Sequence, residues 1–166
     1  KALIFNNENK VLLLERDHPI KKIYWDIPGG RIQKDESIRE TLLRELREEI
    51  GLLPEHVQIV AQTKGWLRYR LPQRYIRSDS DPVCIGQKQK WFLLRMLGTD
   101  ADIKLTIGKK PEFDDWQWVN YWFPLSQVIH FKREVYRRAM KELSPMFFGT
   151  TTKGSMAKTL NSIMWR

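Results

Sequence analysis

The chain has 166 residues, 42% hydrophobic and 30% charged, a balance that fits one globular domain with a real core. Its single cysteine, Cys84, excludes an intramolecular disulfide and favours a reducing, cytoplasmic location, and apolar runs such as residues 11–14 are far too short to span a membrane. The formal net charge of +9 favours an anionic partner such as nucleic acid, nucleotide phosphate or a membrane surface, although it also fits simple solubility.

Short apolar and β-branched runs, separated by turn residues, predict a series of strands. The runs are residues 2–5, 11–14, 23–27, 57–63, 66–71, 90–97 and 116–119. Three asparagines between the first two runs predict a hairpin turn. The chain begins at Lys1 and enters the first run at once, so we expect a few residues to precede it in the natural protein.

Two stretches show the three- and four-residue spacing of an amphipathic helix. The first is residues 37–50, with Asp35 or Ser37 as its cap and Gly51 as its stop. The second carries an apolar stripe from Val128 to Leu143, and we expect Pro145 to end it. Residues 72–86 are rich in Pro, Asp and Ser and predict a loop.

The order strand, helix, strands, helix predicts a mixed β-sheet sandwiched between α-helices, an α/β or α+β fold. We find no repeat and no domain break, so one domain should cover residues 1–148. The remaining residues, 149–166, are polar and predict a poorly ordered tail.

The first predicted helix carries three glutamates at positions that share one face. Glu45 precedes Glu48 by three residues and Glu49 by four, so their carboxylates should lie close together. Such a patch repels itself unless a cation neutralises it, and hard oxygen ligands suit Mg²⁺ or Mn²⁺. The alternative is a solvated helix face with pairs such as Arg44 to Glu48.

The complete pattern around these glutamates resembles the Nudix box, a 23-residue loop–helix–loop motif. All nine of its fixed positions are filled, by Gly30, Glu36, Arg44, Glu45, Leu46, Glu48, Glu49, Gly51 and Leu52. The resemblance implies the Nudix fold and water attack on a phosphorus of a diphosphate linkage, with Mg²⁺ as cofactor and Mn²⁺ or Zn²⁺ as possible substitutes.

The resemblance also implies roles for individual residues. Glu45, Glu48 and Glu49 would bind metal together with a backbone carbonyl near Gly29. Arg44 and Glu36 would hold the helix and loop in place. For the general base we prefer Glu45, with Glu49 and Glu112 as the other candidates.

Two further blocks, residues 65–95 and 111–138, resemble the bacterial RNA pyrophosphohydrolase group. That group removes pyrophosphate from RNA 5′ ends, leaving a 5′ monophosphate for mRNA decay, and it overlaps the dinucleoside polyphosphate hydrolases. The likeness makes Glu112 a fourth metal-binding acid, with Asp114 and Asp115 as rivals. It places Arg16, Tyr69, Gln87, Phe131 and Lys132 at the substrate. This chain departs from the group at Arg31, where a second glycine is usual, and in a longer stretch at 17–24.

The composition of residues 61–95 agrees with an RNA end as the substrate. Eight basic residues outnumber two acidic ones there, and aromatic side chains that could stack on bases lie between them. Taken singly, each of these aromatics is better explained as core, and it is the segment as a whole that favours a functional role. Phe131 fits the stripe of the second helix as well as a base-stacking role. The other hypotheses are a dinucleoside polyphosphate hydrolase and a catalytically silent RNA-binding module. We rank the silent module last because every acid of the box is present.

Overall fold

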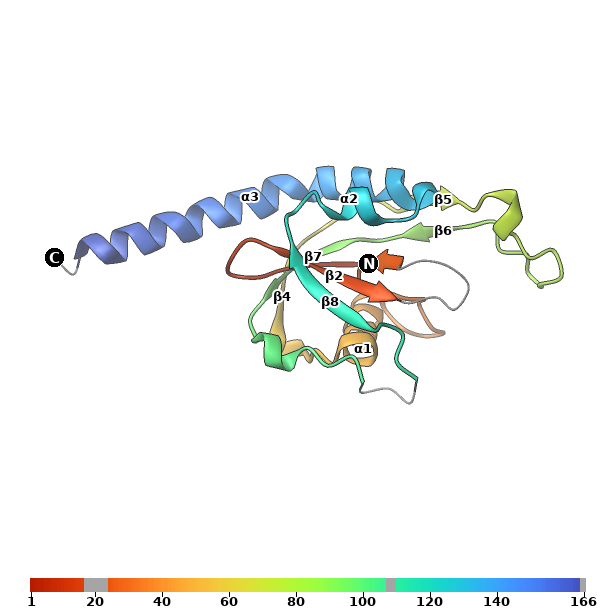
Figure 1. Cartoon of the computed structure of the whole chain (residues 1–166), viewed down its shortest axis with the longest axis horizontal. Helices are drawn as coiled ribbons and strands as arrows, with labels where there is room; N and C mark the ends of the chain where they lie inside the picture. The colour runs from red at the N-terminus through yellow and green to blue at the C-terminus, as the bar shows by residue number, and fades with distance from the viewer. Residues whose placement is uncertain (17–23, 107–109, 165–166) are drawn as a thin grey trace.

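A six-stranded mixed sheet lies at the centre of the computed structural model, which describes residues 1–16, 24–106 and 110–164, with side chains as far as Gly149 (Figure 1). Its strands follow the order β3 (Tyr24–Asp26), β2 (Val11–Arg16), β1 (Ala2–Phe5), β7 (Phe92–Met96) and β4 (Val57–Gln62), and β8 (Asp115–Val119) also pairs with β2. β1 is parallel to β7, and the other pairings are antiparallel. The predicted mixed sheet is confirmed.

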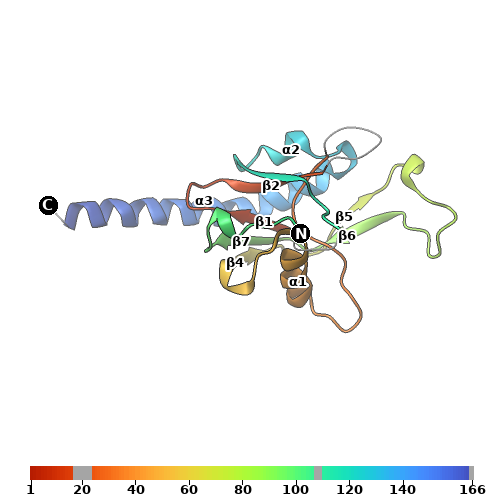
Figure 2. The ribbon, with the colours of Figure 1, turned by 60° about the horizontal axis from the view of Figure 1, so that its bottom comes forward.

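Helices lie on both sides of this sheet, as predicted. Helix α1 (Ile38–Ile50) covers one face, while α2 (Pro124–Gln127), α3 (Arg133–Met164) and a two-stranded sheet of β5 (Leu67–Arg70) and β6 (Gly86–Gln89) lie on the other (Figures 1 and 2). Four short 3₁₀ turns join the elements: η1 (Pro54–His56), η2 (Gln73–Tyr75), η3 (Asp100–Asp102) and η4 (His130–Lys132).

Two apolar layers hold the helices to the sheet because successive strand residues point to opposite faces. In β1, Leu3 and Phe5 pack with α3, whereas Ala2 and Ile4 pack with α1. All four are essentially inaccessible to water. β1 is therefore apolar at every position, which explains why its sequence is a continuous apolar run rather than an alternating one.

Both ends of α1 use the residues that the sequence marked. The Ser37 hydroxyl accepts a hydrogen bond from the Glu40 amide at 3.1 Å, and the Glu40 carboxylate accepts one from the Ser37 amide at 2.7 Å, a reciprocal capping box. At the other end Gly51 adopts a φ of 72° and donates its N–H to the Arg47 carbonyl.

The structure corrects the sequence-based expectations at three places. Helix α3 continues through Pro145, because the next turn is held by Phe147, which is buried and stacks on Tyr121 with ring centroids 4.5 Å apart. The predicted loop 72–86 contains η2 and ends in β6, a polar strand whose sequence lacks a strand pattern. Phe131 and Lys132 lie in η4, before α3 begins.

The backbone of α3 is helical to Met164, whereas we expected a poorly ordered tail from residue 149; that expectation and the domain boundary at 148 stay predictions. Residues 17–23, most of the longer stretch, lie outside the described residues. Within the described part of the chain, no helix has the length and apolar character needed to cross a membrane.

Replacing Gly51 with alanine should destabilise the protein by about 1 kcal/mol, because a side chain disfavours the left-handed conformation that ends α1. The measurement is urea unfolding of the two proteins. The matched control is Gly65→Ala, since a Cβ at Gly65 would meet no atom within 4 Å and should leave the unfolding midpoint unchanged. Equal losses in both variants would show that the conformation of Gly51 is not the cause.

Candidate active site

A single guanidinium group organises the acidic face of α1. Arg44 donates from Nε and Nη2 to the two carboxylate oxygens of Glu36, at 2.7 and 3.1 Å. Its Nη1 donates to Glu45 at 2.9 Å and to Glu48 at 3.0 Å. Arg44 and Glu36 therefore join the helix to the loop before it through direct hydrogen bonds, and their role in the reaction stays a prediction. The positive charge that lies between Glu45 and Glu48 is therefore the guanidinium of Arg44, a residue of the same helix.

Glu36 is the fixed end of this arrangement. It also accepts hydrogen bonds from the Thr41 hydroxyl at 2.6 Å and the Gln33 amide at 3.0 Å. Hydrogen bonds from Arg44 are the main reason that the pKa of Glu36 falls to about 2, so Glu36 stays ionised. The loop before α1 is thus tied to the helix by a charge that does not titrate near neutral pH.

The two glycines before the box let the loop pass close to α1. The Gly29 amide donates to a carboxylate oxygen of Glu49 at 2.9 Å, and Gly29 has a φ of 153°, which disfavours any other residue. A Cβ on Gly30 would collide with the carboxylate of Glu45. Position 30 therefore requires glycine because Glu45 lies against the backbone, whereas position 29 requires it because of its φ and the close approach of Lys1.

Glu49 differs from the other acids because its side chain is buried. It is only 5% exposed, and burial raises its pKa to about 8, a rise that the charges of Glu45 and Glu112 increase. Glu112 is thus near enough for its charge to act on Glu49. Its loop is anchored by the buried Phe113 and by a hydrogen bond from the Asp114 amide to the Glu15 carbonyl at 2.8 Å.

The predicted convergence of three box glutamates is not seen in the described residues, where no three His, Cys, Asp or Glu side chains gather closely enough to hold a metal ion. Glu48 points outward, 57% exposed, and Glu49 turns toward Gly29. Nevertheless, the donors fit Mg²⁺ in kind, because they are hard oxygens. A buried carboxylate with a raised pKa is also a group that a cation would stabilise.

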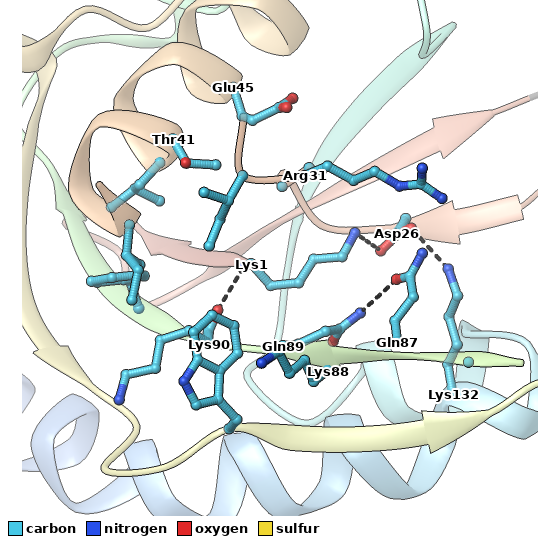
Figure 3. Close-up of a pocket in the computed structure, with 18 of the residues that line it drawn as sticks. Lys1, Asp26, Arg31, Thr41, Glu45, Gln87, Lys88, Gln89, Lys90 and Lys132 are labelled. Carbon is cyan, nitrogen blue, oxygen red and sulfur yellow. Dashed lines mark hydrogen bonds and ion pairs between the residues drawn. The ribbon is translucent and has the colours of Figure 1, made fainter. Parts of the chain in front are cut away.

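A cavity of about 590 Å³ lies beside Glu45, between the loop 29–32 and strand β6 (Figure 3). Its walls differ in charge: Glu45 lies on one side, and amides and cations lie opposite. The polar and charged lining residues are Lys1, Asp26, Arg31, Thr41, Glu45, Gln87, Lys88, Gln89, Lys90 and Lys132. A concave site of this kind, acidic at one end and basic at the other, suits a phosphate chain held beside a divalent cation.

Asp26 is a residue of this cavity that the sequence analysis missed. It lies between Lys1 Nζ at 3.0 Å and Lys132 Nζ at 3.3 Å (Figure 3). It also accepts a hydrogen bond from Tyr136. Burial opposes its charge, but the two lysines and Tyr136 outweigh burial and lower the pKa of Asp26. A lone acid in an otherwise apolar strand, directly before the glycine loop, was the signal that could have revealed it.

The predicted substrate residues divide into three groups. Gln87 and Lys132 line the cavity. Tyr69 and Phe131 lie close together, with ring centroids 5.8 Å apart, and Phe131 also lies 5.2 Å from Tyr75. Phe131 is only partly buried and belongs to neither apolar layer. Arg16 ends β2 as an exposed residue and is not among the residues that line the cavity.

Comparison with known proteins identifies a family and close relatives for this chain. The family model described as the NUDIX domain matches residues 1–145. The RNA pyrophosphohydrolase of Acinetobacter baylyi is 60% identical over 141 residues, which cover 85% of this chain and 83% of that protein. The RNA pyrophosphohydrolase of Hahella chejuensis is 61% identical over 124 residues, 75% of this chain and 77% of that protein.

Solved structures show the same fold at low identity. The E. coli dihydroneopterin triphosphate pyrophosphohydrolase superimposes with a TM-score of 0.60 at 17% identity, over 82% of this chain and 90% of that one. A MutT protein from Methanosarcina mazei gives a TM-score of 0.54 at 26% identity, over 82% and 87% of the two chains.

Glu49 should make the metal-free protein less stable as the pH rises. Its folded pKa of about 8 lies above the ordinary value of 4.5, so the stabilisation is complete below pH 4.5 and is lost as the pH rises through about 8. The difference in unfolding free energy between the wild type and Glu49→Gln, measured by urea titration in a chelator, should therefore change between pH 5 and pH 8.5. A constant difference across that range would contradict the assignment.

Proposed function

Because this chain belongs to the NUDIX domain family, we propose that it hydrolyses the 5′ triphosphate or diphosphate end of RNA and leaves a 5′ monophosphate. The observation that carries the proposal is the cavity, in which Glu45 faces a wall of lysines and amides. Two residues of that wall adjoin the aromatic pair, because Gln87 lies opposite Tyr69 in the hairpin and Lys132 follows Phe131. The relatives named RNA pyrophosphohydrolase support it over most of the chain. We assign the activity to residues 1–148 and to the cytoplasm.

The acidic end of the cavity would hold the reacting phosphate through metal. We propose Glu45, Glu48, Glu49, Glu112 and the Gly29 carbonyl as ligands of Mg²⁺, for which Mn²⁺ or Zn²⁺ could substitute. When bound, the ion neutralises phosphate oxygens and acidifies a water molecule.

Protein groups then orient the reaction. Arg44 fixes Glu45 and Glu48, and Glu45 lies at the cavity wall, where its carboxylate can accept the proton of the attacking water. Our preferred general base is therefore Glu45.

The basic end would recognise the 5′ nucleotide. Lys132 and Gln87 point into the cavity, where an ammonium and an amide can bind phosphate oxygens or a base edge. Tyr69 and Phe131 offer rings on which a base can stack. Arg16, at the end of β2, is the weakest of these assignments because it does not line the cavity.

A dinucleoside polyphosphate offers the same cavity a phosphate chain and a nucleoside, so it is the second candidate substrate. The two substrates differ in the part of the molecule beyond the first nucleotide. We expect kcat/KM to be at least tenfold higher, roughly the effect of one stacked base, for a triphosphorylated oligonucleotide than for a dinucleoside tetraphosphate in the same buffer. A higher kcat/KM for the dinucleoside tetraphosphate would identify the small molecule as the substrate. If neither compound is hydrolysed, the remaining hypothesis is a catalytically silent RNA-binding module.

Removing one carboxylate charge should abolish most turnover without unfolding the protein. We expect Glu48→Gln to lower kcat by about 10² or more at limiting Mg²⁺, since the amide keeps the size of the side chain but binds a hard cation poorly. Glu48 is exposed, so its thermal unfolding should change little. The control is Glu55→Gln, an exposed acid in η1. Full activity of Glu48→Gln at low Mg²⁺ would remove Glu48 from the ligand set.

Replacing Phe131 with alanine separates a stacking residue from a core residue. Loss of one base stack, about 1–3 kcal/mol, should lower kcat/KM for triphosphorylated RNA by about tenfold or more. A small triphosphate substrate without a second nucleotide should be affected much less. If the variant instead loses several kcal/mol of stability and slows on every substrate equally, Phe131 is part of the core.

A further inference from the structure

The hairpin formed by β5, η2 and β6 extends away from the body of the protein (Figures 1 and 2). Its two faces differ because alternate residues of a strand point to opposite sides. Leu67 and Tyr69 point inward, where Leu67 is buried in the α3 layer and Tyr69 packs against that layer and Phe131. Arg68 and Arg70 alternate with them and are exposed.

The outward face concentrates positive charge in an unfavourable register. Arg68 lies directly opposite Lys88 across the two strands, and Arg70 lies opposite Gly86. Like charges that face each other across an antiparallel pair are destabilising. In the described part of the chain, none of Arg68, Arg70 and Lys88 forms an ion pair with a carboxylate that would offset this repulsion.

The same face is continuous with the wall of the cavity. Lys88 and Trp66 both line the cavity, and Lys88 Nζ lies 5.0 Å from the centre of the Trp66 ring. Trp66 is 38% exposed, so its ring is accessible. Gly86 keeps the space opposite Arg70 free of a side chain, and a Cβ there would collide with the Tyr69 carbonyl oxygen. A chain that leaves the cavity along β6 would therefore meet Trp66 and Lys88 first and Arg68 and Arg70 next.

We propose that this outward face, made of Trp66, Arg68, Arg70 and Lys88, binds the single-stranded RNA downstream of the 5′ nucleotide. The inference rests on the proposed function, since it extends the same substrate beyond the cavity. Phosphates lying between Arg68 and Lys88 would turn a repulsive pair into a shared anion site, and Trp66 offers a surface for a base. In this arrangement the inward face of the hairpin, through Tyr69, contacts the 5′ nucleotide, and the outward face binds the nucleotides that follow it.

If the outward face binds RNA, the enzyme should prefer longer RNA substrates to shorter ones. We expect a triphosphorylated dinucleotide to occupy only the cavity, whereas an unstructured oligonucleotide of about a dozen nucleotides should extend to Arg68 and Arg70. Binding of the longer RNA should depend steeply on salt, by roughly 0.7 units of slope for each phosphate neutralised on a single strand.

The test compares the double variant Arg68→Gln/Arg70→Gln with the control Arg138→Gln/Lys141→Gln, which removes two exposed charges from α3. We expect the first variant to lose about tenfold in kcat/KM on the long RNA, to keep activity within about twofold on the dinucleotide, and to lose about one unit of salt slope. The control should behave as wild type. Arg68→Lys/Arg70→Lys should retain most of the salt slope because it keeps both charges.

Three results would overturn the proposal: equal losses on both RNA lengths, equal losses in the control, or no preference of the wild type for length. A folding defect is separable, because relieving the Arg68–Lys88 repulsion should leave thermal stability unchanged or raised. If the wild type fails to hydrolyse any triphosphorylated RNA, the proposed function fails instead. In that case, binding of a 5′-hydroxyl oligonucleotide, measured by fluorescence anisotropy, tests the outward face without any hydrolysis. A lower affinity of the Arg68→Gln/Arg70→Gln variant would support RNA binding by this face, and an unchanged affinity would refute it.

Discussion

The site depends on the contacts of one side chain, Arg44. Three carboxylates, those of Glu36, Glu45 and Glu48, accept hydrogen bonds from its guanidinium, which also donates to the Arg31 carbonyl. Without this cation the acids of α1 would repel one another, and the loop before the helix would keep only its contacts from Glu36 to Thr41 and from Gly29 to Glu49. A lysine could supply the charge but not the planar fork, so the geometry requires arginine at this position.

The rest of the site is assembled from the two sides of one sheet. The acidic end comes from α1 and the loop before it, while the basic end comes from η4 and β6 on the opposite side. Asp26, at the end of β3, joins them, because it accepts from Tyr136 of α3 and pairs with Lys132 while lining the same cavity as Glu45. The apolar layers on both faces of the sheet therefore fix the distance between the two ends.

The sequence predicted helix α1 and both of its ends well because their determinants are local. The three- and four-residue spacing, the Ser37 cap and the Gly51 stop all act within α1. The sequence predicted other elements poorly where contacts between distant segments determine the structure. Phe147 carries α3 past Pro145 by packing on Tyr121, and β6 is a strand through its pairing with β5 rather than through an apolar pattern. The burial of Glu49 and the partners of Asp26 likewise depend on segments far apart in the chain.

This division explains why the motif indicates a reaction more readily than a substrate. The phosphate chemistry needs hard oxygen ligands held at close range, and a single loop and helix can supply most of them with a fixed spacing. The substrate recognition proposed above instead relies on Gln87, Lys132 and Phe131 and on a hairpin that supplies none of the proposed metal ligands. Because that hairpin packs on the domain through one face only, the residues of its outward face can change without disturbing the sheet or α1. On the proposal made here, substrate length is therefore selected independently of the chemistry, at positions that no spacing within the box constrains.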